Sequence, residues 1–129
     1  SYTGRKLGMP STHNASRSLQ SSPSVSPTNL CLASGEHTGD EIISTVKDGL
    51  YVTELFGFGV NGITGDYSQG AAGFWIRDGK LAEPVHEFTI AGNLKSILKS
   101  IEMVGNDPHL QSSVRCPTFK VTELMVAGR

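Results

Sequence analysis

The sequence predicts an α+β domain dominated by β-structure, with a mainly antiparallel sheet or barrel-like core and two short helices. Apolar residues make up 37% and charged residues 18% of the 129 residues, while Ser, Thr, Gly and Asn are abundant. This balance favours strands and turns over long helices. Asp78-Gly79 lies between two apolar segments, which is the pattern of a β-hairpin. The length is that of about one domain, so residues 1–129 are expected to form a single domain.

The N-terminal third begins with little structural signal. Residues 11–28 are rich in Ser, Thr, Asn and Pro, contain scarcely any apolar side chain and follow no regular period. They therefore predict an exposed loop or a mobile segment. A short apolar run at residues 29–33 predicts a strand. Thr38 and Glu41 then have the spacing of a capping box, which predicts a helix over residues 39–48.

Strands and one further helix follow. Gly49 is expected to end the first helix, and residues 50–56, rich in β-branched and aromatic side chains, predict a strand. Strands over residues 74–77 and 80–90 flank the hairpin turn, and Pro84 places the second of them at a sheet edge or a bulge. The remaining expected elements are a helix capped by Asn93 that runs to about Met103 and ends at Gly105, and a strand over residues 118–127.

A glycine-rich segment around the only tryptophan precedes the hairpin. Glycine costs backbone entropy when ordered, so a structural or functional reason is expected for this concentration. Within it, Asp66 is either a ligand contact or a turn aspartate that accepts backbone N–H groups, and the turn role is favoured. We expect structural roles for the glycines of this segment and its turn: Gly62, Gly65, Gly70, Gly73 and Gly79.

The titratable residues predict neither a catalytic nor a metal site in this chain. Cys31 and Cys116 lie far apart in the sequence, without a Cys-x-x-Cys or His-x-x-x-His pattern, so structural zinc is not expected. Count alone allows a disulfide between them, but the sequence favours two reduced, partly buried thiols. None of the four histidines lies at a metal-ligand spacing from another His, a Cys or a carboxylate, and no Gly-x-Ser-x-Gly nucleophile motif occurs.

The net charge and the apolar runs exclude two classes of partner. The formal charge is −1, and no basic cluster extends beyond Arg5-Lys6, so direct nucleic-acid binding is not expected. No apolar run approaches the roughly 18 residues that a membrane span requires. We therefore expect a cytoplasmic protein that makes no membrane contact.

Nine segments, in chain order, resemble the C-terminal part of the TldD/PmbA family, whose members are called modulators of DNA gyrase. Together they cover nearly the whole chain outside the Ser/Pro-rich stretch. They are Arg5-Lys6-Leu7-Gly8, Asn29-Leu30, Thr53-Glu54-Leu55, Thr64-Gly65-Asp66-Tyr67-Ser68, Gly70-Ala71-Ala72-Gly73-Phe74-Trp75, Pro84-Val85, Thr89-Ile90-Ala91-Gly92-Asn93-Leu94, Val104-Gly105-Asn106-Asp107 and Val126-Ala127-Gly128.

The resemblance implies a peptidase system that works as a heterodimer. Its TldD-type subunit carries a His-Glu-x-x-x-His zinc motif, upstream of the region matched here, and its PmbA-type (TldE) subunit does not. Two features favour the PmbA type: the sequence Thr64-Gly65-Asp66-Tyr67-Ser68, and the short link at residues 110–115. TldD-type chains have a longer insertion at that link, with a cysteine that ligates the metal. Cys116 lies outside any such insertion, so this role is not carried over to it.

The resemblance thus implies the C-terminal, non-catalytic domain of a PmbA-like subunit, paired with a TldD-like subunit or with a second copy. Zinc is expected in the TldD-like partner and no cofactor in this chain. The expected ligand is an extended peptide, and residues expected to contact peptide or partner are Asp66, Tyr67, Asn93 and Asn106. Two alternatives stay open: part of a TldD-like metallopeptidase with its zinc motif upstream, and a protein-binding module that acts on gyrase or another partner.

Overall fold

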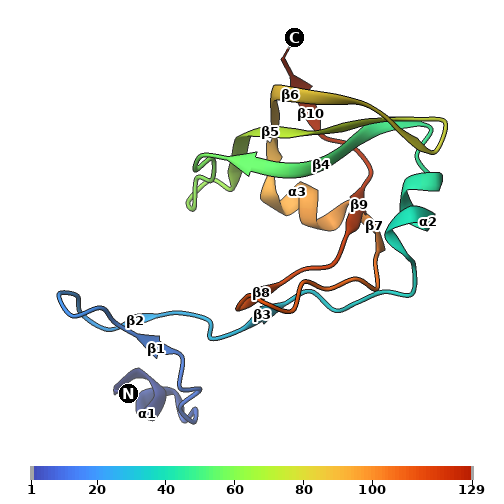
Figure 1. Cartoon of the computed structure of the whole chain (residues 1–129). Coiled ribbons are helices and arrows are strands. Elements are labelled where there is room, and N and C mark those ends of the chain that lie inside the picture. Colours follow the sequence, from blue (N-terminus) through green and yellow to red (C-terminus); the bar gives the residue numbers. More distant parts are fainter. Residues whose placement is uncertain (1, 129) are drawn as a thin grey trace.

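A four-stranded antiparallel sheet forms the body of the molecule, in a computed structural model that describes residues 2–128 (Figure 1). The sheet has the strand order β10-β6-β5-β4, so that β4 and β10 form its two edges. Among the described residues the sheets are open and no barrel closes, which selects the first of the two predicted cores. The strands are β4 (Asp48–Phe56), β5 (Asp66–Arg77), β6 (Lys80–Asn93) and β10 (Met125–Ala127).

The predicted hairpin joins β5 to β6. Asp78 and Gly79 have φ of 48° and 74°, the left-handed values that this tight turn requires. The N–H of Gly79 donates to the Val46 carbonyl at 2.9 Å, so the turn contacts the segment between the first helix of the body, which ends at Ser44, and β4. Pro84 lies beside a register shift and outside the part of β6 that β10 covers, which is residues 89–91. The prediction of an edge or bulge at this proline is confirmed.

Helix α2 (Gly39–Ser44) begins as predicted and ends earlier. The Thr38 hydroxyl accepts from the Glu41 N–H at 3.2 Å, and the Glu41 carboxylate accepts from the Thr38 N–H at 2.7 Å. The prediction that the helix continues to residue 48 is wrong. Asp48 and Gly49 already pair with β5, so Gly49 belongs to a strand and does not end the helix.

Helix α3 (Leu94–Lys99) is also shorter than predicted. Asn93 caps it, but the chain then forms β7 (Ile101–Val104), which pairs with β9 (Phe119–Val121) in a separate ribbon. The expected helix through Met103 is therefore wrong, because pairing with β9 overrides the helical spacing of the apolar residues. The single strand expected over residues 118–127 is in fact β9 and β10, which belong to different sheets.

The N-terminal elements lie away from the sheet in Figure 1. Residues 11–28 are almost entirely exposed, as expected, and contain a hairpin of two-residue strands. The predicted strand at residues 29–33 is present in shortened form and pairs in parallel with a segment near the C-terminus. The sequence did not predict the first helix. The N-terminal elements are α1 (Tyr2–Leu7), β1 (Ala15–Ser16), β2 (Ser24–Val25) and β3 (Leu30–Cys31), and the segment that pairs with β3 is β8 (Val114–Arg115).

The hydrophobic core is small for the length of the chain. Ala71, Phe88 and Ile90 form its buried centre, and partly buried side chains from β4, β5 and β6 pack around them. Among the described residues only six hydrophobic residues are buried, whereas nineteen large hydrophobic ones are exposed. Much of the apolar surface therefore has no cover within residues 2–128.

Candidate functional site

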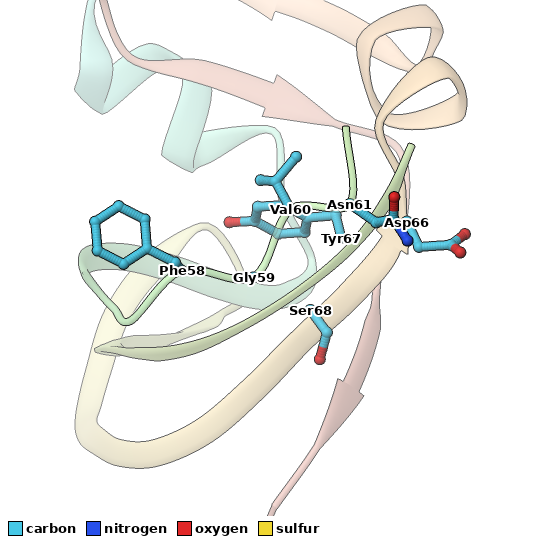
Figure 2. A pocket seen from close by; sticks show the side chains of 7 residues that line it. All are labelled: Phe58, Gly59, Val60, Asn61, Asp66, Tyr67 and Ser68. Carbon is cyan, nitrogen blue, oxygen red and sulfur yellow. The ribbon is translucent and has the colours of Figure 1, made fainter. Parts of the chain in front are cut away.

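The loop between β4 and β5 folds back along β5 and forms a hollow beside the sheet edge (Figure 2). Val60 makes a β-bridge to Tyr67, the N–H of Ser68 donates to the Gly59 carbonyl at 2.7 Å, and the N–H of Asn61 donates to the Asp66 carbonyl at 2.8 Å. The hollow is open to solvent and has a volume of about 500 Å³. Its lining residues are Phe58, Gly59, Val60, Asn61, Asp66, Tyr67 and Ser68.

Hydrogen bonds hold this loop in place. The Asn61 side-chain oxygen accepts from the N–H groups of Ile63 at 3.0 Å and Thr64 at 3.2 Å. The Gln69 amide donates to the Gly57 carbonyl at 2.7 Å. A Cβ at Gly59 would overlap the Ser68 carbonyl, so only glycine allows this close approach to β5. The loop is therefore a defined surface, although few apolar contacts support it.

The loop presents apolar side chains to solvent and carries no charged side chain of its own. Residues 55–65 contain no Asp, Glu, Lys or Arg. Phe58 and Ile63 are fully exposed and Val60 is 54% exposed. Figure 2 shows Val60 beside Tyr67 and Phe58 turned away from both. Apolar and aromatic side chains without charges are typical of the centre of a binding surface.

Three of the four expected contact residues lie together at one end of this surface. Asp66 is the direct partner of Asn93 in the β5–β6 register, and Tyr67 follows it. The Asn93 amide donates to the Thr64 carbonyl at 3.1 Å, while the Thr64 hydroxyl donates to the Asp66 carboxylate at 2.7 Å. Asp66 thus accepts a side-chain hydroxyl in this turn. Burial raises the pKa of the Tyr67 phenol above its ordinary value of 10.0, at which the hydroxyl is already protonated at neutral pH.

Asn106 lies apart from the other three, at the end of the β7–β9 ribbon. Its N–H donates to the His37 carbonyl at 2.8 Å. The next residue, Asp107, accepts the Thr118 N–H at 2.9 Å and the Thr118 hydroxyl at 2.7 Å. These hydrogen bonds lower the pKa of the Asp107 carboxyl. Sequence reasoning missed this residue, because Asp107 entered it only as part of a family segment, without its partner eleven positions away.

The expected structural glycines differ in what the backbone requires. Gly65 has φ of 80°, and a Cβ at Gly73 would overlap the Tyr51 carbonyl on β4. Gly79 occupies the hairpin turn described above. A Cβ at Gly70 would make ordinary contact with Phe56, and one at Gly62 would meet open space.

The described part of the chain offers no donor set for a metal. No group of three His, Cys, Asp or Glu residues among residues 2–128 is placed to hold an ion, so zinc does not fit here. Cys31 and Cys116 are both free, and each residue is largely exposed. Partial burial of the Cys116 thiol, and to a lesser extent the nearby Asp107 charge, raises the pKa of that thiol. No helix within residues 2–128 has the length and hydropathy to cross a bilayer.

Comparison with known proteins gives a consistent family. Residues 1–128 match the PmbA/TldA metallopeptidase C-terminal domain. The chain is 41% identical over 129 residues to metalloprotease PmbA of Escherichia coli O157:H7, covering all of this chain and 27% of that protein. The chain thus spans about a quarter of the length of this curated relative.

Two solved structures share the fold. A proposed modulator of a DNA gyrase from Thermotoga maritima superposes with a TM-score of 0.85 and 34% identity, over 97% of this chain and 28% of that one. TldE from Thermococcus kodakarensis also gives a TM-score of 0.85, at 24% identity, over 98% of this chain and 30% of that one. The second likeness establishes the fold alone.

Proposed function

The chain belongs to the PmbA/TldD metallopeptidase family as its C-terminal domain, and we propose that it is the non-catalytic scaffold of a PmbA-type (TldE-like) subunit. This subunit pairs with a TldD-like subunit in a cytoplasmic, zinc-dependent peptidase complex and helps to enclose an extended peptide. The zinc and the hydrolytic groups belong to the partner. The identity with a PmbA protein over the whole chain supports the PmbA type.

The open edge of β4 is the observation that carries this proposal. Within residues 2–128 no strand pairs with the outer side of β4, which has nine residues. At about 3.3 Å per residue such a strand is about 30 Å long, enough for an extended peptide. A peptide added to this edge would be held by main-chain hydrogen bonds, which tolerate varied side chains.

The hollow continues this edge beyond the end of β4. Residues 59–61 lie beside β5 in the row that β4 occupies further along. Val60 and Tyr67 supply an apolar wall, and Asp66 and Asn93 supply polar groups next to it. We assign peptide contacts to this group. Asn106 lies on the other ribbon and is assigned to the contact with the partner subunit.

Two substitutions at Leu50 test the edge. The Tyr51 carbonyl faces Gly73 of β5, so by strand alternation the N–H of Leu50 points to the open edge. Leu50→Pro removes this donor, while Leu50→Ala removes the same core side chain and keeps the donor. Each variant is made in the full-length parent, mixed with the TldD-like subunit and assayed for complex formation by light scattering and for hydrolysis of an unstructured peptide.

We expect both variants to form the complex, and we expect Leu50→Pro alone to raise the KM for the peptide, by about tenfold for one lost main-chain hydrogen bond of about 1.4 kcal/mol. Equal KM values for the two variants would rule out peptide pairing on β4. Absence of any complex with the wild-type parent would rule out the scaffold role. A parent that forms only homodimers and hydrolyses the peptide unaided would instead be the enzyme itself.

A further inference from the structure

Residues 2–31 form an N-terminal arm that contributes almost nothing to the body of the domain (Figure 1). The arm comprises α1, the β1–β2 hairpin and β3. It is joined to the body chiefly at its end, where the N–H of Leu30 donates to the Ser113 carbonyl at 2.9 Å and β3 pairs with β8. No residue of the arm is buried.

The arm is too small to be ordered by its own contacts. Helix α1 has six residues, well below the roughly 12–15 at which isolated helices become even marginally stable in water. The β1–β2 hairpin has two residue pairs, and an isolated hairpin is marginal at best. Fixing each backbone residue costs about 1–2 kcal/mol, which buried apolar surface must offset. Ordering the arm therefore requires buried surface from outside residues 2–128.

The arm also exposes the side chains that could bury such surface. Leu19, at the tip of the hairpin, is completely exposed, and Val25 on β2 is 89% exposed. On and next to α1 the apolar side chains are again in solvent. The full set is Tyr2, Leu7, Met9, Leu19, Val25 and Leu30.

Charge separates the arm from the rest of the chain. The arm contains Arg5, Lys6 and Arg17 and no acidic residue, since Glu36 is the first in the sequence. All twelve Asp and Glu residues lie beyond the arm, with the other eight Lys and Arg residues. A surface that receives the arm therefore combines apolar sockets with acidic groups.

We propose that the arm docks on the domain that precedes it in the full-length protein, on a surface with apolar sockets and an acidic rim. Relatives are about four times as long as this chain, and residues 1–128 match their C-terminal domain, so in those relatives most of the protein precedes the matched region. The preceding domain is covalently joined to α1, which gives it a high effective concentration at the arm. The arm thereby fastens the two domains to each other. This inference does not depend on the peptidase role.

Hydrogen exchange and trypsin cleavage after Arg17 test the proposal in the full-length protein without any other subunit. We expect slow exchange for the amides of residues 4–28 and slow cleavage after Arg17. Leu19→Ser should accelerate both by at least about tenfold, the effect of losing one buried leucine contact. Gln20→Ser, at the neighbouring exposed residue, is the matched control and should leave both rates unchanged.

Three outcomes would overturn the proposal. The arm could exchange fast in the full-length protein under all conditions. Protection could appear only after a TldD-like subunit is added, which would place the arm in the subunit interface. Protection could also rise with protein concentration, which would assign the arm to a second copy of the chain. Because neither peptide nor zinc is present, failure here leaves the scaffold proposal separately testable.

Discussion

Gly73 and Gly62 come from one glycine-rich segment and differ in what surrounds them. Gly73 faces the backbone of β4, where an added Cβ would overlap the Tyr51 carbonyl, whereas Gly62 faces open space. The local sequence does not distinguish the two positions, because the difference comes from a strand more than twenty residues away.

Gly73→Ala should therefore destabilise the domain by about 1–3 kcal/mol, the usual cost of forcing an extra methyl group into a packed site. Gly62→Ala should be neutral or stabilising by up to about 1 kcal/mol, because alanine restricts the unfolded chain. Urea denaturation of both variants measures the difference. Equal effects at the two positions would contradict the close approach of β4 to Gly73.

Asp107 makes the stability of the domain depend on pH. Hydrogen bonds from Thr118 favour the ionised carboxyl, so its pKa in the folded state lies below the ordinary value of 3.8. The carboxylate consequently stabilises the fold at pH values above 3.8, and this contribution is lost as the pH falls through the folded-state pKa.

Asp107→Asn keeps an acceptor for the Thr118 N–H and removes the titration. We expect the variant to lose less stability than the wild type between about pH 5 and pH 2, the range in which such a carboxylate titrates. Denaturant midpoints across this range provide the measurement, and Asp40→Asn, at an exposed carboxylate, is the control. Parallel pH curves for wild type and Asp107→Asn would show that the ionised form of Asp107 adds nothing to the stability of the fold.

At the scale of elements, Asn93 connects helix α3 to the candidate site. Its side-chain oxygen accepts the Lys95 N–H and so caps the helix, while its amide donates to the Thr64 carbonyl. Leu94 adds a backbone bond to the Gly65 carbonyl at 2.8 Å. The start of α3 and the loop that carries Asp66 are thus one hydrogen-bonded unit.

Two substitutions separate the functions of Asn93. Asn93→Asp keeps the capping oxygen and loses the donor to Thr64, so α3 should remain while amide exchange at Gly65 and Asp66 accelerates. Asn93→Ala loses both and should cost about 1 kcal/mol more than Asn93→Asp, the usual value of an N-cap. Urea denaturation and hydrogen exchange report the two effects. Unchanged amide exchange at Gly65 and Asp66 in both variants would show that the Asn93 side chain does not couple the loop to helix α3.

The elements that the sequence predicts well are those decided by neighbouring residues. The capping box at Thr38, the Asn93 cap and the Asp78-Gly79 turn each depend on residues within three positions of one another. The predicted helix ends were wrong where distant pairing decides: Asp48 and Gly49 join β5, and residues 101–104 join β9.

In the candidate site, too, neighbouring residues decide some features and distant strand pairing decides others. Family segments indicate Asp66, Tyr67 and Asn93 individually, but their proximity follows from the β5–β6 register. That register contains shifts between Ala71 and Gly73 and between Phe74 and Ile76. Pro84, the partner of Phe74, indicates the second shift, but no local pattern predicts the first. The fold class was accessible from composition and turn residues, whereas the hollow at residues 58–61 required the folded backbone.

At the scale of the whole molecule, three exposed features each require a binding partner. The β4 edge, the charge-free loop and the arm all present groups that are unsatisfied within residues 2–128, and the buried core is small. A domain of this kind gains stability from what binds it. We therefore expect its boundary with the preceding domain to be a large interface, to which the arm contributes.

A protease site inserted before Ser1 of the full-length protein tests this interface. After cleavage the two fragments should stay together in size-exclusion chromatography, because the arm still docks. Raising the NaCl concentration from about 0.1 M to 1 M shortens the screening length from about 10 Å to 3 Å and should promote separation. A variant with Arg5→Ala and Arg17→Ala should bind more weakly at low salt and show little salt dependence. Fragments that separate at low salt directly after cleavage would show that only the peptide bond joins the two domains. If the wild-type fragments associate equally well at low and high salt, the proposed acidic rim is wrong.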